Sequence, residues 1–180
     1  MHYLLLHGTG CTPESHWFPR LRDLLQEQWH TVSIPALPHA KRPDWKSGRD
    51  FLLANFRFDN ETVLIGHSSG ATLILSVLEA LEQPIAKAIL VSGFYEVLGE
   101  WDISQLMLPE QFDRDQIHSH CKDIILINSD NDPWGCDDTQ ARPVAEILGA
   151  QFVLATGMGH MGSGTFGDPC LELPLLVEYC

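Results

Sequence analysis

Residues 62–71 read TVLIGHSSGA, and this stretch decides the fold of the chain. An apolar strand runs into Gly-x-Ser-x-Gly and then directly into a helix, which is the order of elements in a nucleophile elbow. In such an elbow Ser68 lies on a tight, strained turn that holds its hydroxyl at the carboxyl edge of a sheet. The flanking glycines let neighbouring backbone approach without a Cβ clash. The motif therefore predicts that the chain forms a covalent acyl-enzyme.

Length and composition predict one globular domain over residues 1–180. The chain is 44% hydrophobic and 19% charged, and a chain of this length buries about two-thirds of its unfolded surface. Its formal net charge of -13 repels phosphate backbones and anionic lipids, so neither nucleic acid nor a membrane is expected as a partner. The five cysteines are scattered and the amino terminus lacks a basic lead, so we expect a cytoplasmic protein without a secretory signal.

Six short apolar runs alternate with longer helical stretches, as buried parallel strands do. They cover residues 3–6, 31–34, 63–66, 86–92, 124–128 and 151–155. The alternation predicts an α/β fold, namely a doubly wound, predominantly parallel six-stranded sheet with helices on both faces. The helix after Ser68 is apolar nearly all round and is expected inside this fold. Gly149 is expected to stop a later helix, and the one long excursion, residues 93–120, could roof a pocket.

A serine hydroxyl needs a base to take its proton, and the base needs a carboxylate to hold its tautomer. The loop after the fifth strand offers Asp130 and Asp132, and the loop after the sixth offers His160. The chain order Ser68, Asp132, His160 is the order expected of α/β-hydrolases. Asp132 is preferred to Asp130 because it lies deeper in its loop and precedes Pro133. These three residues are the predicted triad.

Acyl transfer also needs two donors for the oxyanion. One should be the backbone amide of Ser69, at the start of the helix, where the helix dipole favours negative charge. The second should come from the loop after the first strand, residues 7–11, through the amide of Thr9 or Gly10. His67 is adjacent to Ser68 in sequence, so a structural role is favoured for it over that of base.

Taken together, HGTG at 7–10, HW at 16–17, GHSSG at 66–70, NDP at 131–133 and GH at 159–160 resemble the small serine hydrolases of the YdeN and retinoblastoma-binding-protein type. This family is a compact branch of the α/β-hydrolases. The resemblance covers nearly the whole chain and implies a fold without a leading antiparallel hairpin or a large lid. It also implies Ser68, Asp132 and His160 as triad, with esterase-like or peptidase-like turnover of small substrates.

A retinoblastoma-type partner is not carried over from this resemblance. That interaction uses Leu-x-Cys-x-Glu, whereas the nearest match, residues 168–172, reads DPCLE and lacks the leucine. The expected partner is instead a small-molecule acyl substrate. An acyl pocket would be lined by aromatic and apolar residues near the predicted sheet edge, for which the candidates are Trp17, Phe94, Trp101, Trp134 and Met158.

No cofactor and no metal are predicted. Gly8 and Gly10 could open a dinucleotide fingerprint, but Pro13 replaces its third glycine. Asp130 begins a stretch like a calcium loop, but Trp134 stands where an EF-hand needs an oxygen ligand. The predicted function is hydrolysis of small carboxylic esters, or of thioesters or amides. The alternatives are a non-catalytic binding or scaffolding protein of the same fold, and a lyase or transferase that uses the same serine.

Overall fold

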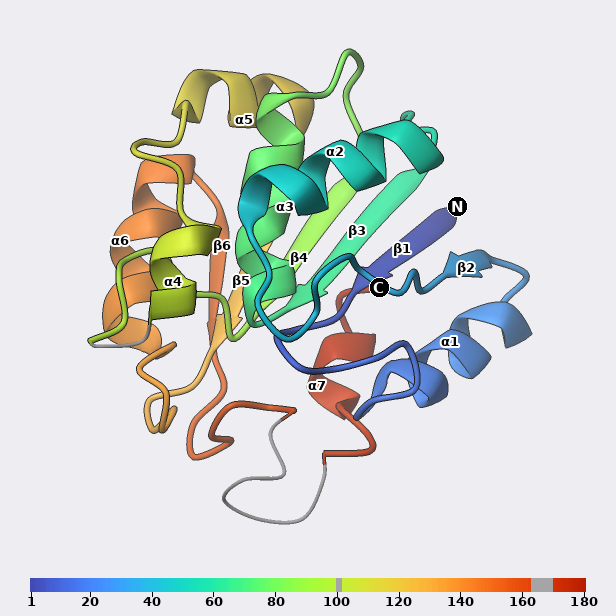
Figure 1. Cartoon of the computed structure of the whole chain (residues 1–180). Coiled ribbons are helices and arrows are strands. Elements are labelled where there is room, and N and C mark those ends of the chain that lie inside the picture. The colour runs from blue at the N-terminus through green and yellow to red at the C-terminus, as the bar shows by residue number, and fades with distance from the viewer. Residues whose placement is uncertain (100–101, 163–169) are drawn as a thin grey trace.

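The chain is described by a computed structural model over residues 1–99, 102–162 and 170–180. Its centre is a six-stranded sheet in the order β2-β1-β3-β4-β5-β6, with every neighbouring pair parallel (Figure 1). Each predicted apolar run forms a strand, so the α/β fold class is confirmed. The strands are β1 (His2–Leu6), β2 (Thr31–Ser33), β3 (Thr62–His67), β4 (Lys87–Val91), β5 (Ile124–Asn128) and β6 (Gln151–Leu154).

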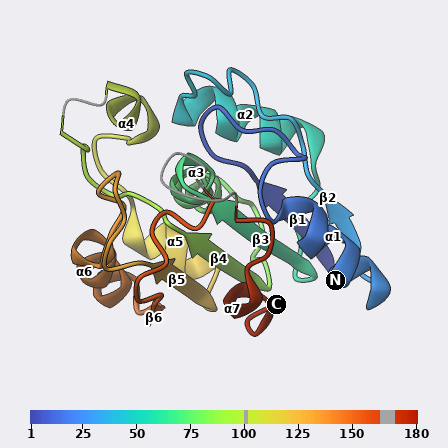
Figure 2. The same cartoon turned by 90° about the horizontal axis from the view of Figure 1, so that it is seen from below.

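The strands sort their side chains onto two faces, because successive residues of a strand point to opposite sides. In β1, Leu4 and Leu6 pack into one hydrophobic cluster, whereas Tyr3 and Leu5 pack into the other. The strands β3, β4 and β5 alternate in the same way. Both faces of the sheet are therefore apolar, and helices cover both, as predicted (Figure 2).

The helices divide unequally between the two faces (Figures 1 and 2). One face carries α2 (Trp45–Asn55), α3 (Ser69–Glu79), α5 (Arg114–His120) and α6 (Asp138–Leu148), and the other carries α1 (Phe18–Glu27) and α7 (Pro174–Val177). The short α4 (Asp102–Met107) packs on α2 and α3. Gly149 adopts the left-handed conformation directly after α6, with φ of 64°, so its predicted role as a helix stop is confirmed.

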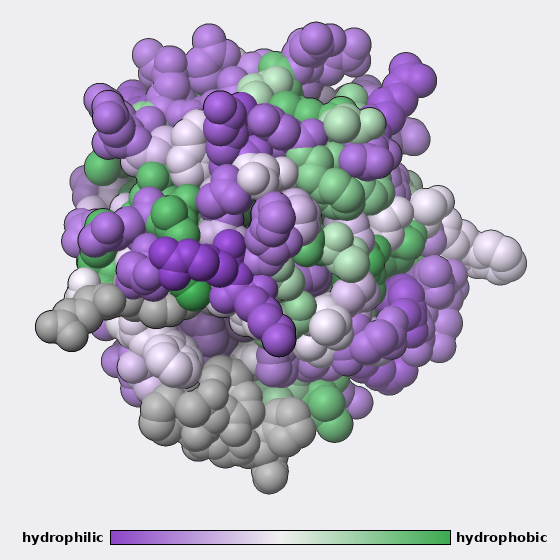
Figure 3. All heavy atoms as spheres, viewed as in Figure 1, coloured by the Kyte–Doolittle hydropathy of each residue, from purple (hydrophilic) through white to green (hydrophobic). Residues whose placement is uncertain are grey.

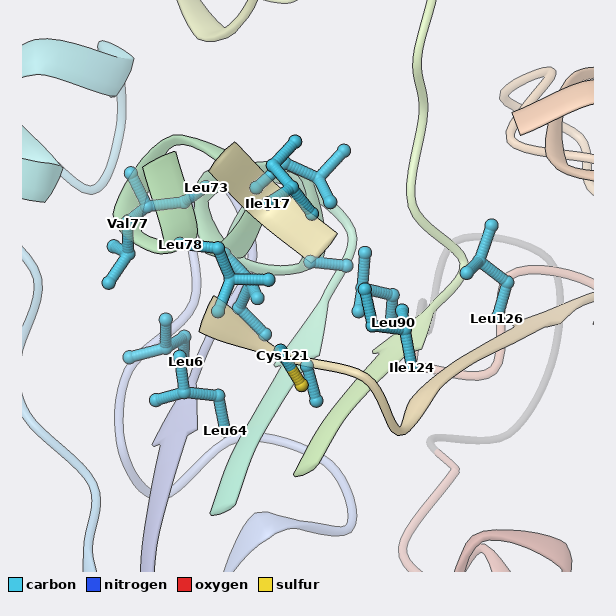
Figure 4. Packing of buried hydrophobic residues seen from close by; sticks show 14 of the residues in the cluster. Leu6, Leu64, Leu73, Val77, Leu78, Leu90, Ile117, Cys121, Ile124 and Leu126 are labelled. Atoms are coloured by element: carbon cyan, nitrogen blue, oxygen red, sulfur yellow. The ribbon is translucent and has the colours of Figure 1, made fainter. Parts of the chain in front are cut away.

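The helix α3 lies in the middle of the first layer, and all its residues from 69 to 78 are buried. Figure 4 shows Leu73, Val77 and Leu78 of α3 among side chains from the sheet and Ile117 of α5. This burial explains the nearly uniform apolar composition of α3, because each of its faces meets protein. The helix is thereby a rigid support for the residue that directly precedes it, which is Ser68.

Hydrophilic side chains cover much of the face seen in Figure 3. This agrees with the excess of 24 acidic residues over 11 basic ones. Over residues 1–99, 102–162 and 170–180, the helices are all too short or too polar to cross a membrane.

Because all the strands are parallel, their carboxyl ends meet at one edge of the sheet. The loops after β1, β3, β5 and β6 leave from this edge. The strand order also reverses beside β1, since β2 lies on one side of it and β3 on the other. Open α/β sheets bind ligands in the crevice at such a switch point. Ser68 follows β3 at this position.

Candidate active site

The turn between β3 and α3 holds Ser68 in a strained conformation. Its φ is 55° and its ψ is -125°, a combination that costs a non-glycine residue on the order of 1–3 kcal/mol. The surroundings fix this conformation, because the Ser68 N–H donates to the Val91 carbonyl at 2.9 Å. The Ser68 carbonyl accepts from the amides of Ala71 and Thr72. The serine predicted from the motif therefore sits on the expected tight turn.

Two glycines let the backbone close around this turn. A Cβ on Gly66 would lie 2.5 Å from the Gly70 carbonyl oxygen, and a Cβ on Gly70 would overlap the Leu6 carbonyl oxygen. Gly8, in the loop after β1, likewise leaves space only for its own hydrogen, since a Cβ there would lie 2.9 Å from Cβ of Ser68. The close approach brings the loop after β1 against the serine.

The loops after β5 and β6 bring Asp132 and His160 together. Oδ2 of Asp132 lies 2.7 Å from Nδ1 of His160, and both side chains are almost fully buried. Because a carboxylate can only accept, Nδ1 carries the proton and Nε2 is left as the basic nitrogen. The second carboxylate oxygen of Asp132 accepts from the Trp134 amide at 2.9 Å. The carboxylate thus orients the imidazole while its own position is held by the backbone.

Asp130, the other acid considered, does not face this imidazole. Its Oδ1 accepts from the amide of Gly157 at 2.7 Å, and its side chain is exposed. The structure therefore brings Asp132 to His160 and gives Asp130 a contact with the backbone of the loop after β6.

His67 lies between the serine turn and the loop that carries His160. Its ring centroid is 4.9 Å from that of His160, and its Nε2 donates to the His160 carbonyl at 2.8 Å. Burial, followed by the neighbouring His160 and His16, holds the pKa of His67 well below its ordinary value. The ring is therefore neutral and buried, and its Nδ1 has no hydrogen-bond partner among the described residues.

The hydroxyl of Ser68 and Nε2 of His160 make no hydrogen bond within the described ranges. In enzymes without substrate, such catalytic contacts are often long and close only in the complex. His67 connects the two residues, because it directly precedes Ser68 in the chain and its ring packs on the ring of His160.

The loop after β1 is tied to the start of α3. Oγ1 of Thr9 donates to Oγ of Ser69 at 3.0 Å. The amide of Gly10 already donates to the Ala40 carbonyl at 2.7 Å. Of the two candidates for the second oxyanion donor, Thr9 is therefore the one whose amide is not committed to another described residue. The amide of Ser69 is in the first turn of α3, where backbone donors have no helical partner.

A buried histidine, His7, shapes the same loop. Its Nε2 accepts from the Leu37 amide at 3.1 Å, so the proton lies on Nδ1, which donates to the Gly8 carbonyl at 3.0 Å. Burial lowers the pKa of His7, which keeps this ring neutral. The sequence placed His7 in a motif without assigning it this role, because hydrogen bonds to distant backbone leave no signal in a single sequence.

The predicted pocket residues differ in how exposed they are in the structure. Trp17 and Phe94 are buried, at 1% and 0% exposed, and Trp17 lines a hollow between α1 and α7. For both residues a role in an acyl pocket stays a prediction. Trp134 and Met158 are exposed, in the loops after β5 and β6, where they stay candidates. Trp101 lies outside the described residues.

Two hollows differ in their relation to the site. A cavity of about 10 Å³ lies beside the oxyanion loop and the start of α3, and its lining includes Gly8, Ser69 and Met107. A larger hollow of about 300 Å³ lies between α1 and α7, and neither Ser68, Asp132 nor His160 lines it. These three residues do not line the small cavity either, which adjoins the serine turn through Gly8 and Ser69.

One group of three potential metal ligands occurs in the described part of the chain, and two of its members are the hydrogen-bonded Asp132 and His160. The third is Cys136, whose pKa is raised well above its ordinary value by burial and by the nearby carboxylate. A protonated thiol is a poor metal ligand. The group is accordingly an acid–base pair beside a neutral thiol.

The strained serine between a strand and a buried helix, with an acid–histidine pair at the same sheet edge, defines the class of this protein as an α/β-hydrolase. A family model described as serine hydrolase matches residues 3–166. The chain belongs to this serine hydrolase family and is an enzyme, which favours the catalytic prediction over a binding or scaffolding module and confirms the family resemblance.

Individual relatives agree with this assignment. The serine hydrolase RBBP9 of Rattus norvegicus is 28% identical over 167 residues, which cover 90% of this chain and 87% of the relative. The hydrolase YdeN of Bacillus subtilis (strain 168) is 29% identical over 131 residues, covering 71% and 69%. The crystal structure of the B. subtilis ydeN product superposes with a TM-score of 0.90 at 24% identity, over 99% of this chain and 95% of the other. This superposition shows the same fold.

Proposed function

We propose that this enzyme hydrolyses small carboxylic esters through an acyl-enzyme on Ser68, with His160 as the general base and Asp132 as its orienting acid. The observation that carries the proposal is the 2.7 Å hydrogen bond between Asp132 Oδ2 and His160 Nδ1, at the same sheet edge as a serine held at φ of 55°. A strained serine and an imidazole oriented by a carboxylate are the two parts that covalent acyl transfer needs.

In the proposed reaction, His160 Nε2 takes the proton of Ser68 while Oγ attacks the ester carbonyl carbon. The resulting oxyanion is stabilised by the amides of Ser69 and Thr9. The tetrahedral intermediate then expels the alcohol, which receives the proton from His160, and the acyl group stays on Ser68. A water molecule, deprotonated by the same histidine, attacks the acyl-enzyme, and the free acid leaves as the Ser68 hydroxyl is restored.

The size of the small cavity beside the oxyanion loop favours substrates with short acyl groups. Its volume of about 10 Å³ is close to the space of one water-sized sphere, and its apolar lining includes Leu37, Leu73 and Met107. An acyl chain of a few carbons would have to displace these side chains. Thioesters and amides form the same acyl-enzyme and differ from esters only in the leaving group. Because the acyl side of the site does not contact the leaving group, these substrates stay within the proposal.

The experiment that tests the proposal is labelling of the purified enzyme with a fluorophosphonate probe, followed by mass spectrometry of the adduct. We expect one adduct on Ser68 in the wild type and none in Ser68→Ala. Ser76→Ala is the matched control, because Ser76 is buried in the same helix and its hydroxyl has no described partner; this variant should be labelled like the wild type. An unlabelled wild type, or labelling that persists in Ser68→Ala, contradicts the mechanism.

A series of p-nitrophenyl esters of increasing acyl length tests the substrate class. We expect kcat/KM to be highest for the acetyl and propionyl esters and to fall for longer chains. A preference for long chains would show that the acyl group binds elsewhere than at the small cavity.

A further inference from the structure

The loop after β6, residues 157–162, is held by side chains from other parts of the chain. Oδ1 of Asp130 accepts from the Gly157 amide at 2.7 Å, and Oδ1 of Asn131 accepts from the Gly159 amide at 2.8 Å. These two acceptors immediately precede Asp132 in the chain. The loop after β5 thus contacts the backbone of the His160 loop at two points and its imidazole at a third.

Two further side chains hold the same loop through its carbonyl groups. His67 Nε2 donates to the His160 carbonyl at 2.8 Å, and Trp17 Nε1 donates to the Met161 carbonyl at 2.7 Å. Gly162 packs directly on the His67 ring, since a Cβ there would lie 2.7 Å from its Cε1. Two side-chain acceptors therefore bind the amides of Gly157 and Gly159, and two side-chain donors bind the carbonyls of His160 and Met161.

The side chain of Met161 also anchors this loop, since it is buried in the hydrophobic cluster that contains Trp17, but the described backbone of the loop makes few contacts of its own. Gly157, Gly159 and Met161 all have positive φ, at 73°, 57° and 48°, so the segment has no regular backbone pattern. Its one internal backbone bond within the described range runs from the Met161 amide to the Met158 carbonyl at 3.4 Å, and the Met158 amide donates to the Ala155 carbonyl before the loop at 3.2 Å. A loop with so few internal contacts opens easily unless side chains from the scaffold hold it.

Proton transfer is sensitive to such opening. A base that moves by about 1 Å from its productive position can lose on the order of 100-fold in rate. Asp132 alone fixes the direction of the imidazole but not the position of the backbone that carries it. The four contacts supply that second constraint.

We infer that Asp130, Asn131, His67 and Trp17 are positioning residues for His160, which together form a loop clamp that holds residues 157–161 in the reactive arrangement. This inference rests on the proposed function, in which His160 is the base. Within the clamp, Asn131 has the central role, because its Oδ1 accepts from the Ser129 hydroxyl at 2.6 Å as well as from Gly159. Ser129 thereby orients the amide so that its oxygen faces the loop.

Asn131 is also the best position for a test, because it is exposed, and its replacement leaves the core intact. Asn131→Ala removes the acceptor, whereas Asn131→Asp keeps an oxygen that can accept from both Ser129 and Gly159. Asp113→Ala is the matched control. Asp113 is an exposed residue that accepts from two backbone amides, and it lies beside Glu79, at the end of α3 remote from Ser68.

The first measurement is steady-state hydrolysis of p-nitrophenyl acetate across a pH range. We expect Asn131→Ala to lower kcat by about 10-fold to 100-fold with KM changed less than about 2-fold. Asn131→Asp should restore at least half of the wild-type kcat at the plateau of its pH profile, and Asp113→Ala should match the wild type. Unchanged kcat in Asn131→Ala, or equal losses in the alanine and aspartate variants, overturns the inference.

The second measurement does not depend on turnover. Amide hydrogen exchange followed by NMR should show at least about 10-fold faster exchange at Gly159 in Asn131→Ala, and at Gly157 in Asp130→Ala, with Asp130→Asn close to the wild type. Wild-type exchange rates at both glycines in these variants contradict the clamp even in an active enzyme. If the wild type neither hydrolyses esters nor is labelled at Ser68, the proposed function is wrong, and so is the catalytic role of the clamp. The exchange data would still show whether the side chains hold the loop.

Discussion

Oδ2 of Asp132 and Nδ1 of His160 lie 2.7 Å apart, although 28 positions separate the residues in the chain. The distance is that of a strong, charge-assisted hydrogen bond. The two residues lie in the loops that follow neighbouring strands, since β5 and β6 are paired through Asn128 and Leu154. The sheet therefore sets the separation of the two loops, and the side chains close the remaining gap.

Replacing Asp132 should be far more damaging than replacing Asp130. In Asp132→Asn the side-chain amide no longer selects the tautomer with a free Nε2, so we expect kcat to fall by about 10⁴-fold. Asp130→Asn keeps the acceptor for the Gly157 amide, and its kcat should stay within about 3-fold of the wild type. Hydrolysis of p-nitrophenyl acetate by both variants checks this, and similar losses in the two would point to Asp130 as a second acid.

The hydrogen bond between Thr9 and Ser69 should matter for the oxyanion donors. Thr9→Val and Ser69→Ala each remove one hydroxyl and keep both backbone amides, so we expect kcat/KM to fall by about 5-fold in each, through looser positioning. The double variant should lose little more, which corresponds to a coupling of about 1 kcal/mol. Fully additive losses would show that the two hydroxyls act independently.

Two glycines on helices should respond in opposite ways to alanine. A Cβ at Gly70 would overlap the Leu6 backbone carbonyl, whereas one at Gly48 meets only methyl carbons of Leu73. We expect Gly70→Ala to lower the free energy of unfolding by more than about 3 kcal/mol. Gly48→Ala should change it by less than about 1 kcal/mol, because the gain in helix propensity offsets a small shift of Leu73. Urea unfolding followed by circular dichroism measures both.

The buried ring of His67 should make stability depend on pH. Its pKa is lowered well below the ordinary value, mainly by burial. Between that lowered pKa and about 6.5, the unfolded chain binds a proton that the folded chain does not. The free energy of unfolding should therefore rise with pH across this window, and the stability is lost as pH falls below about 6.5, at up to about 1.4 kcal/mol per pH unit.

His67→Gln isolates this contribution, because glutamine does not titrate and its Nε2 can still donate to the His160 carbonyl. The difference in unfolding free energy between wild type and His67→Gln should shrink as pH is lowered from about 7 to about 5. His16 and His160 also face this ring and are present in both proteins, so their contributions largely cancel in the comparison. A difference that is constant with pH would show that His67 is not the group responsible.

The sequence was sufficient for the main parts of the fold and the identity of the candidate triad. Six apolar runs alternating with helices specify a parallel sheet, because only strands buried on both faces are apolar throughout. The Gly-x-Ser-x-Gly motif specifies the strained turn, because neither Gly66 nor Gly70 has space for a Cβ. The order of serine, acid and histidine then follows from the order of the strands.

Only the tertiary structure decided which groups support these residues. Asp130 and Asp132 are chemically identical and two positions apart, and the sheet geometry turns one to a backbone amide and the other to the imidazole. Trp17 and His67 reach the His160 loop across more than 90 positions of sequence. Such contacts depend on where each loop leaves the sheet, and a pattern of local periodicity contains no information about the distance between loops. Local preferences thus determine strands, helices and the turn at Ser68, whereas long-range packing determines which side chain meets which.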